Sequence, residues 1–357
     1  MHCVNTDNLK GTEVLGMAVV SSSDAVLIAE GTVLNNAYIQ KLRELGIKSV
    51  YINDSDSKAD SGTDAKPVFS IDDTYKESKQ EIEKILEKHI YKHNDDLKKV
   101  AGEAVKIMGT VLEEPDVVNG LTEIRNISTD MYSHCINVCT MSTILALRLR
   151  MTENQVHNIA MGAILHDIGL KYISAGYNDV DVEDLNSKEQ VEYKKHTIYG
   201  YSAIQEEKWL SDISKDIILL HHEREDGTGY PFRQSGARIR QEVKLVTVCD
   251  DFDAMISGIG RKKMKIYEAI EYIKVNSGII YDAAVASKLL KTMAVYPVGT
   301  KVITSEGETG IVEKQNVEAP ERPVIRIISD AEGREPATPI IKNLMRQLTL
   351  FIVDTVD

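Results

Sequence analysis

The sequence is poor in basic residues and has no long apolar run. Its 357 residues include 42 Lys and Arg against 55 Asp and Glu, a formal net charge of −13 at pH 7. Since a duplex phosphate backbone requires a basic face, we expect no duplex nucleic acid as partner. No apolar run approaches the roughly 20 residues of a membrane helix, and the first residues lack the basic and apolar regions of a secretory signal. The sequence therefore predicts a cytoplasmic protein without a membrane partner.

Cysteine is also scarce. Four cysteines are too few and too scattered for a disulfide framework in a chain of this length. Cys135 and Cys139 lie four residues apart on a predicted helix, but no second pair follows that would complete a soft-metal site. We interpret both as residues of the hydrophobic core.

The apolar pattern divides the chain into three parts. Residues 1–66 alternate short β-like runs with turns and end in the polar stretch NDSDSKADSGTDAK. This pattern predicts a small α+β module and a linker, for which we expect a regulatory role. Residues 67–297 show helical spacing and predict a helical domain. Residues 298–357 contain short β-branched segments and predict a small β-rich extension. The predicted fold class is mainly α.

Two sets of segments follow from these patterns. The predicted helices cover residues 116–127, 129–150, 154–165, 188–206, 215–222, 241–257, 265–275 and 282–293. The predicted strands of the extension cover residues 301–305, 310–313 and 324–328. A stripe formed by Ile82, Ile85, Leu86 and Ile90 fits either packing on the bundle or a homodimer contact.

Histidines gather in the helical part, with acidic residues close to them in sequence. The set comprises His134, His166, His196, His221, His222 and Asp250. Asp130 precedes His134 by four residues, so both lie on one helix face and can point at one ion. Asp167 follows His166, and Gly169 predicts a helix end that would let both reach a common centre. Imidazole and carboxylate ligands suit iron, manganese or zinc, and paired ions favour phosphodiester hydrolysis.

Three segments, in this order, resemble the motifs of the HD-GYP family, the metal-dependent phosphodiesterases of the bacterial messenger cyclic di-GMP. They are ILHDIG at residues 164–169, HHEREDGTGYP at 221–231 and VCDDFDAM at 248–255. The resemblance spans residues 129–297 and continues into the tail segments YPVGTKV and GETGIVE. It implies an HD-type helical bundle. It also implies that a hydroxide bridging metal ions hydrolyses cyclic di-GMP to linear pGpG. Whether pGpG is then cleaved to GMP stays open.

The resemblance further implies which residues hold these ions. The ligands expected around the first ion are His134, His166, Asp167 and Asp250. Asp167 would bridge to a second ion, held also by His196 and His221. In the trinuclear branch of the family, Asp130 and His222 would hold a third ion. The expected cofactor is thus two or three divalent ions, iron first and manganese as the alternative, with Asp167 and His166 as catalytic residues.

Residues around the ligands are expected to support them. Glu223, Arg224 and Asp226 would orient the metal ligands through hydrogen bonds. Tyr230 in the GYP loop would contact either the substrate or a protein partner.

Two positions depart from the family pattern. Leu170 stands where the family usually has lysine, and Ile259 stands where it commonly has arginine; both basic residues are expected to hold nucleotide phosphates. The candidates to replace them are Lys171, Arg261, Lys262 and Lys263. Two alternatives therefore stay open beside the phosphodiesterase: a metal-bound but catalytically weak sensor of cyclic dinucleotides, and an HD phosphohydrolase for another nucleotide.

Overall fold

The structure is a computed structural model. It describes residues 72–87, 94–113, 130–336 and 338–356, together with short stretches within residues 2–52. The chain forms two compact units, Met1–Val68 and Phe69–Asp357. The predicted linker at 53–66 and the helix predicted at 116–127 lie outside the described residues, so the three-part division of the chain stays a prediction.

The described part of the first unit consists mainly of short paired strands. Strand β1 (His2–Asn5) pairs antiparallel with β4 (Ser49–Ile52). Strand β2 (Val19–Val20) pairs antiparallel with β3 (Val26–Ile28).

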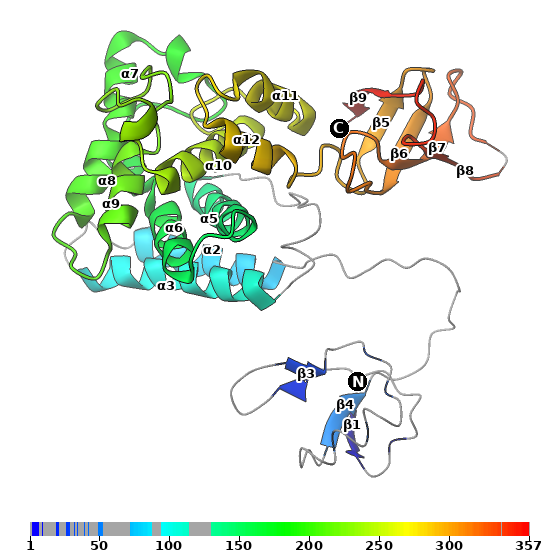
Figure 1. Cartoon of the computed structure of the whole chain (residues 1–357), viewed down its shortest axis with the longest axis horizontal. Helices are drawn as coiled ribbons and strands as arrows, with labels where there is room; N and C mark the ends of the chain where they lie inside the picture. Colours follow the sequence, from blue (N-terminus) through cyan, green and yellow to red (C-terminus); the bar gives the residue numbers. More distant parts are fainter. Residues whose placement is uncertain are drawn as a thin grey trace. The chain divides into compact units, whose positions relative to one another are not determined.

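The second unit begins with a bundle of helices, coloured cyan to yellow in Figure 1, and the predicted mainly α class is confirmed. Its helices are α2 (Asp72–Glu87), α3 (Asn94–Glu113), α5 (Met131–Arg148), α6 (Glu153–Leu165), α7 (Ser187–Lys194), α8 (His196–Ile204), α9 (Asp212–Leu220), α10 (Gln241–Ser257), α11 (Ile266–Asn276) and α12 (Ala283–Leu290). Short 3₁₀ helices are η2 (Ile168–Tyr172), η3 (Val182–Asp184) and η4 (Gly236–Arg238). None of the helices described here is both long and apolar enough to cross a membrane.

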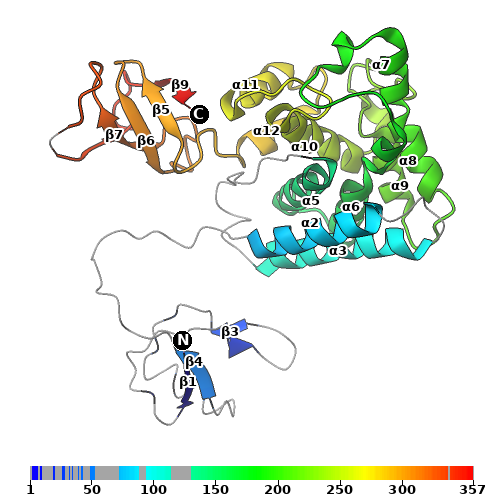
Figure 2. The same cartoon turned by 180° about the vertical axis from the view of Figure 1, so that it is seen from behind.

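Helix α5 lies inside the bundle, where it packs against α6 and α10. Helices α2 and α3 lie side by side along one flank, as both views show (Figures 1 and 2). Ile82 and Ile85 of α2 are buried in the same core as α5, which favours the packing interpretation of their stripe over a dimer contact. Cys135 and Cys139 are buried in this core as predicted.

The predicted helix at 188–206 is two helices in the structure. Helix α7 ends at Lys194 and α8 begins at His196, with Lys195 at the junction donating its N–H to the carbonyl of Glu192 at 3.0 Å. This tighter bond turns the chain while apolar residues continue at helical spacing, so the pattern did not reveal the break. As a result, His196 becomes the first residue of a helix.

The tail forms one antiparallel sheet with strand order β8-β7-β6-β5-β9. Its strands are β5 (Lys301–Thr304), β6 (Thr309–Lys314), β7 (Val324–Ser329), β8 (Ile340–Asn343) and β9 (Ile352–Val356). The first three match the predicted strands, whereas β8 and β9 were not predicted. Lys265 Nζ, at the start of α11, donates a hydrogen bond of 2.6 Å to the carboxylate of Asp354 on β9.

Candidate metal centre

The predicted ligands sit at helix ends or on buried helix faces. His134 lies on α5, His166 and His221 cap the carboxyl ends of α6 and α9, His196 opens α8, and Asp250 lies on α10. Asp167 connects α6 to η2. All six side chains are buried. Segments far apart in sequence therefore converge on one centre.

Gly169 was predicted to end a helix, but its role in the structure is different. Helix α6 ends at Leu165, before Gly169, and the glycine lies in η2 against α8. A Cβ atom at Gly169 would overlap the carbonyl oxygen of His196 and lie 2.7 Å from the amide nitrogen of Gly200. The missing side chain thus lets η2 approach α8 closely, which brings Asp167 next to His196.

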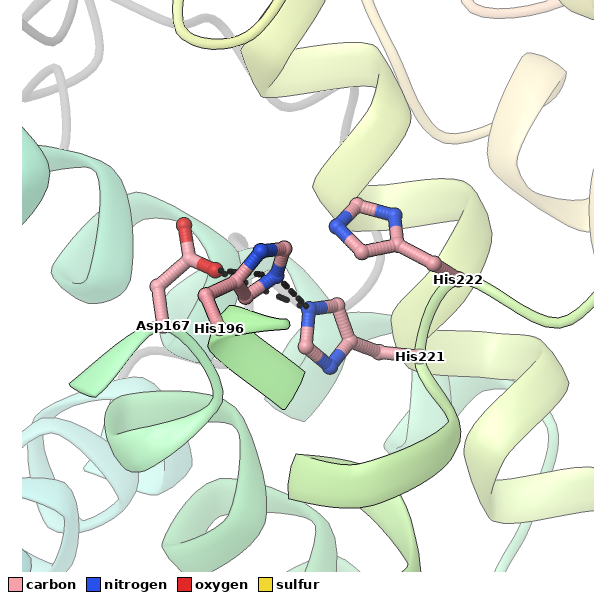
Figure 3. Close-up of side chains that lie close together, drawn as sticks. All are labelled: Asp167, His196, His221 and His222. Atoms are coloured by element: carbon pink, nitrogen blue, oxygen red, sulfur yellow. Dashed lines mark hydrogen bonds and ion pairs between the residues drawn. The ribbon is translucent and has the colours of Figure 1, made fainter. Parts of the chain in front are cut away.

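The Asp167 carboxylate faces two pairs of histidines, one with each oxygen. Its Oδ2 lies 3.6 Å from His134 Nε2 and 3.5 Å from His166 Nε2. Its Oδ1 lies 3.4 Å from His196 Nε2 and 3.6 Å from His221 Nε2, the pair drawn in Figure 3. Each oxygen of this carboxylate could therefore share a divalent ion with its own pair of imidazoles.

Backbone carbonyls orient three of these imidazoles. The Nδ1–H of His166 donates to the carbonyl of Ala163 at 2.7 Å, and that of His196 donates to Tyr193 at 2.7 Å. His221 Nδ1 lies 3.1 Å from the carbonyls of Ile217 and Ile218. A carbonyl only accepts, so Nδ1 carries the hydrogen and Nε2 of the neutral ring offers a lone pair. All three rings therefore present a ligand nitrogen to the centre.

The Nε2 atoms of these histidines lie close together, and no hydrogen-bond donor stands between them among the described residues. His196 Nε2 lies 3.3 Å from His221 Nε2, and burial lowers the pKa of His196 to about 4, so its ring is neutral at pH 7. Within the described part of the chain, Oδ1 of Asp167 and Oδ2 of Asp250 are buried and accept no hydrogen bond. Converging lone pairs and unsatisfied carboxylate oxygens fit divalent cations. The cluster of histidines and aspartates can hold metal ions.

The two carboxylates stay charged despite their burial. Burial alone would raise the pKa of Asp167, but the histidines around it, His166 foremost, hold it well below its usual range. Burial also opposes the charge of Asp250, whose pKa is lowered by its hydrogen bond with His134 and by the other histidines beside it. Both groups are therefore ionised at neutral pH and available to cations.

Asp253 is a functional residue that the sequence reasoning missed. Its Oδ2 accepts a hydrogen bond from His134 Nδ1 at 2.7 Å, and its Oδ1 accepts one from Asn137 Nδ2 at 3.0 Å. A carboxylate behind a ligand histidine fixes the orientation of the ring and raises its basicity. The available signal was its position three residues after Asp250, which places both on one face of α10.

His222 lies beside the second pair of histidines, and Asp130 lies elsewhere. His222 joins Asp167, His196 and His221 in one group whose ligand atoms can share an ion (Figure 3). The groups of this kind among the described residues do not include Asp130. Its carboxylate instead caps α5, accepting the N–H of Ser133 at 2.9 Å, and pairs with Lys79 at 2.7 Å.

Replacing Asp130 with alanine is expected to lower the free energy of unfolding by about 1 kcal/mol, because the cap of α5 is lost. The pair with Lys79 is partly exposed and adds little to this effect. Urea unfolding measures the stability, and metal analysis of the same sample should give an unchanged ion content. A loss of one ion per chain would restore the prediction that Asp130 is a ligand.

The residues expected to orient the ligands instead hold the GYP loop and its surroundings. Glu223 accepts the N–H groups of Phe232 at 2.7 Å and Gln234 at 2.8 Å. Asp226 accepts the N–H and the hydroxyl of Thr228, which closes a turn of the loop. In the structure, these hydrogen bonds of Glu223 and Asp226 are made with the loop and not, as had been expected, with the metal ligands.

Tyr230 and Arg224 lie closer to the centre. The Tyr230 ring stacks on the imidazole of His222, with 4.7 Å between ring centroids. Arg224 donates to the carboxylate of Asp251 at 2.8 Å, next to Asp250 on α10. Both line the cavity over the metal ligands, together with Arg261 and Lys194. Lys171 is not among the lining residues, and Lys194 was not predicted.

Comparison with known proteins agrees with this site. A profile described as "HD domain" matches residues 117–285, and one described as "KOW domain associated with HD domain" matches residues 302–357. The cyclic di-GMP phosphodiesterase PA4108 of Pseudomonas aeruginosa is 27% identical over 242 residues, 68% of this chain and 58% of that protein. The cyclic di-GMP phosphodiesterase of Thermotoga maritima is 32% identical over 186 residues, 51% of this chain and 49% of that protein. The chain therefore contains an HD domain, which confirms the predicted HD-type bundle, and it is similar to proteins named as cyclic di-GMP phosphodiesterases.

A solved structure extends the likeness to the fold. The HDG"Y"P protein Bd1817 from Bdellovibrio bacteriovorus aligns with a TM-score of 0.53 at 17% identity, covering 81% of this chain and 98% of that one. At this identity the likeness shows the fold alone. The chain spans about half the length of the two curated relatives.

Proposed function

We propose that this protein is a metal-dependent phosphodiesterase of the HD-GYP family that hydrolyses cyclic di-GMP to linear pGpG, with further cleavage to GMP. The observation that carries this proposal is the Asp167 carboxylate, which faces a pair of histidines with each oxygen. The curated relatives named as cyclic di-GMP phosphodiesterases support the substrate. Two divalent ions, when bound, supply an activated water and neutralise charge on the phosphoryl oxygens.

The chain's own residues then have distinct tasks. Asp167 and Asp250 provide the negative charge that holds the cations, and the histidines present nitrogens already aimed by their own helices. Tyr230 lines the site and stacks its ring on the imidazole of His222. The net charge of the chain does not oppose an anionic substrate, because bound divalent ions reverse the local field.

We propose two ions, with iron preferred and manganese as the alternative. The donor set of imidazoles and carboxylates supports both metals. The partners of Asp130 argue against a third ion held by that residue. The cytoplasmic location, the homodimer and a protein partner at the GYP loop stay predictions from the sequence.

The test is hydrolysis by metal-loaded protein. The chain is stripped with a chelator and incubated anaerobically with cyclic di-GMP and ferrous or manganous ion, and products are separated by chromatography. We expect linear pGpG only in the presence of metal. A parallel reaction with 3′3′-cGAMP is informative because a relative 28% identical is named as specific for that dinucleotide. Metal-replete protein that leaves cyclic di-GMP intact would contradict the proposal and favour the sensor or another nucleotide.

A further inference from the structure

The two positions that depart from the family pattern supply no charge to the site. Leu170 is 2% exposed and packs in the hydrophobic core. Ile259 is 4% exposed and lines the cavity with an apolar side chain. If the chain binds an anionic nucleotide, the cations that meet its phosphates must come from other positions.

The charges that line the cavity fall into an acidic set and a basic set. The acidic set includes the candidate ligands Asp167 and Asp250, whose charge bound metal ions would match. The basic set consists of Lys194, Arg224 and Arg261. Such a basic set beside a metal centre is suited to phosphate oxygens that the ions do not reach.

Arg261 carries a positive charge in excess of its partner. Arg224 donates to Asp251 at 2.8 Å, whereas the guanidinium of Arg261 lies 3.7 Å from the same carboxylate. Two guanidinium groups therefore share one negative charge, and the closer contact belongs to Arg224. Arg261 also lies over the ring of Tyr272, 5.3 Å from its centroid, which fixes the direction of the side chain. Arg261 is thus a cation with a fixed position whose positive charge is only partly neutralised by Asp251.

Lys194 is the second positive charge in excess. Among the residues that the structure describes, no carboxylate forms an ion pair with it. Its Nζ lies 5.6 Å from the centroid of Tyr230, the ring that stacks on His222. This places the ammonium at the wall of the cavity next to the metal ligands, at the last residue of α7.

A close packing contact joins the two segments that carry these cations. Tyr193, which precedes Lys194, packs its hydroxyl against Gly260, which precedes Arg261. Gly260 has φ +64, and a Cβ atom there would collide with the tyrosine. The carbonyl of Tyr193 also accepts the hydrogen bond that orients His196. One contact thus ties both cations to a metal ligand.

From this arrangement we infer that Lys194 and Arg261 bind the phosphate groups of the nucleotide substrate, in place of the basic residues that the family has at positions 170 and 259. The inference rests on the proposed function, since it assigns the substrate contacts of the same site. Each cation supplies a charge-assisted hydrogen bond to a phosphate oxygen. Neither side chain contacts the metal ligands as a donor, so their loss should leave the ions in place.

The test compares Lys194→Gln and Arg261→Gln with wild-type protein in initial-rate hydrolysis of cyclic di-GMP, at saturating manganese. We expect KM to rise at least about 10-fold in each variant, the effect of losing a hydrogen bond to a charged group. Metal content per chain should equal that of the wild type. Arg261→Lys should recover part of the lost affinity, which separates the charge from any packing role of the arginine.

Two matched variants control for the overall loss of one positive charge. Lys195 and Arg238 are exposed and do not line the cavity, so Lys195→Gln and Arg238→Gln should keep the wild-type KM. If wild-type protein turns over cyclic di-GMP while Lys194→Gln and Arg261→Gln keep its KM, this inference is wrong and the proposed function stands. Loss of bound metal in either variant would also overturn it. If wild-type protein itself shows no turnover, the proposed function has failed instead.

Discussion

Replacing Asp167 with alanine should abolish hydrolysis and remove most of the bound metal. The carboxylate serves both pairs of histidines, 3.5 Å from His166 Nε2 and 3.4 Å from His196 Nε2, so its loss weakens both ion sites at once. Removing a group that only supports a ligand costs about 10–100-fold in metal affinity, and a shared ligand should cost more. Metal analysis after dialysis and product chromatography measure the two effects.

Asp167→Asn keeps the shape of the side chain and separates charge from folding. We expect it to fold, to bind metal poorly and to be inactive, because an amide nitrogen donates hydrogen and cannot bind a cation. Asp184→Asn changes an exposed carboxylate of η3 and should keep wild-type metal and activity. Full metal occupancy in Asp167→Ala would refute the bridging role.

Replacing Gly169 with alanine should destabilise the fold and lower metal occupancy together. The new Cβ would overlap the His196 carbonyl and lie 2.7 Å from the Gly200 nitrogen, and neither backbone atom belongs to a flexible side chain that can swing away. Overpacking of this kind costs about 1–3 kcal/mol or more. Because η2 and α8 must separate, Asp167 moves away from His196, and the ion between them should bind less tightly.

Gly176→Ala is the matched control, since its Cβ would meet no atom within 4 Å. Its stability should stay within about 0.5 kcal/mol of the wild type. Thermal unfolding with and without manganese measures both variants. A Gly169→Ala protein with the melting temperature and metal content of the wild type would show that the contact between η2 and α8 is not needed.

The candidate ligands could be predicted from the sequence because they lie in short motifs of histidine and aspartate. The prediction for Asp130 shows how far residue spacing alone can identify a ligand. Its position four residues before His134 places it on the same helix face as His134. However, Asp130 is the N-cap residue of α5, and its carboxylate accepts a hydrogen bond from the N–H of Ser133. Asp253 was missed although it lies in the quoted motif, because nothing in a sequence tells which carboxylate is a ligand and which supports one.

The fold was predictable where the signal is local. Helix α10 has the predicted bounds, because its apolar spacing and the stop at Gly258 lie within one segment. Lys194 was missed because the break between α7 and α8 leaves the apolar spacing unchanged. Strand β9 was missed because it pairs with β5, nearly fifty residues earlier, and such pairing is not written in either segment alone.

The hydrogen bonds that aim the histidines have a practical consequence for work with this protein. His166, His196 and His221 are each held by a carbonyl only three or four residues earlier in the chain. These bonds form with the helices and do not need the cation. Chelated protein should therefore keep its native circular dichroism, so that different transition metals can be exchanged by dialysis and compared in a single preparation.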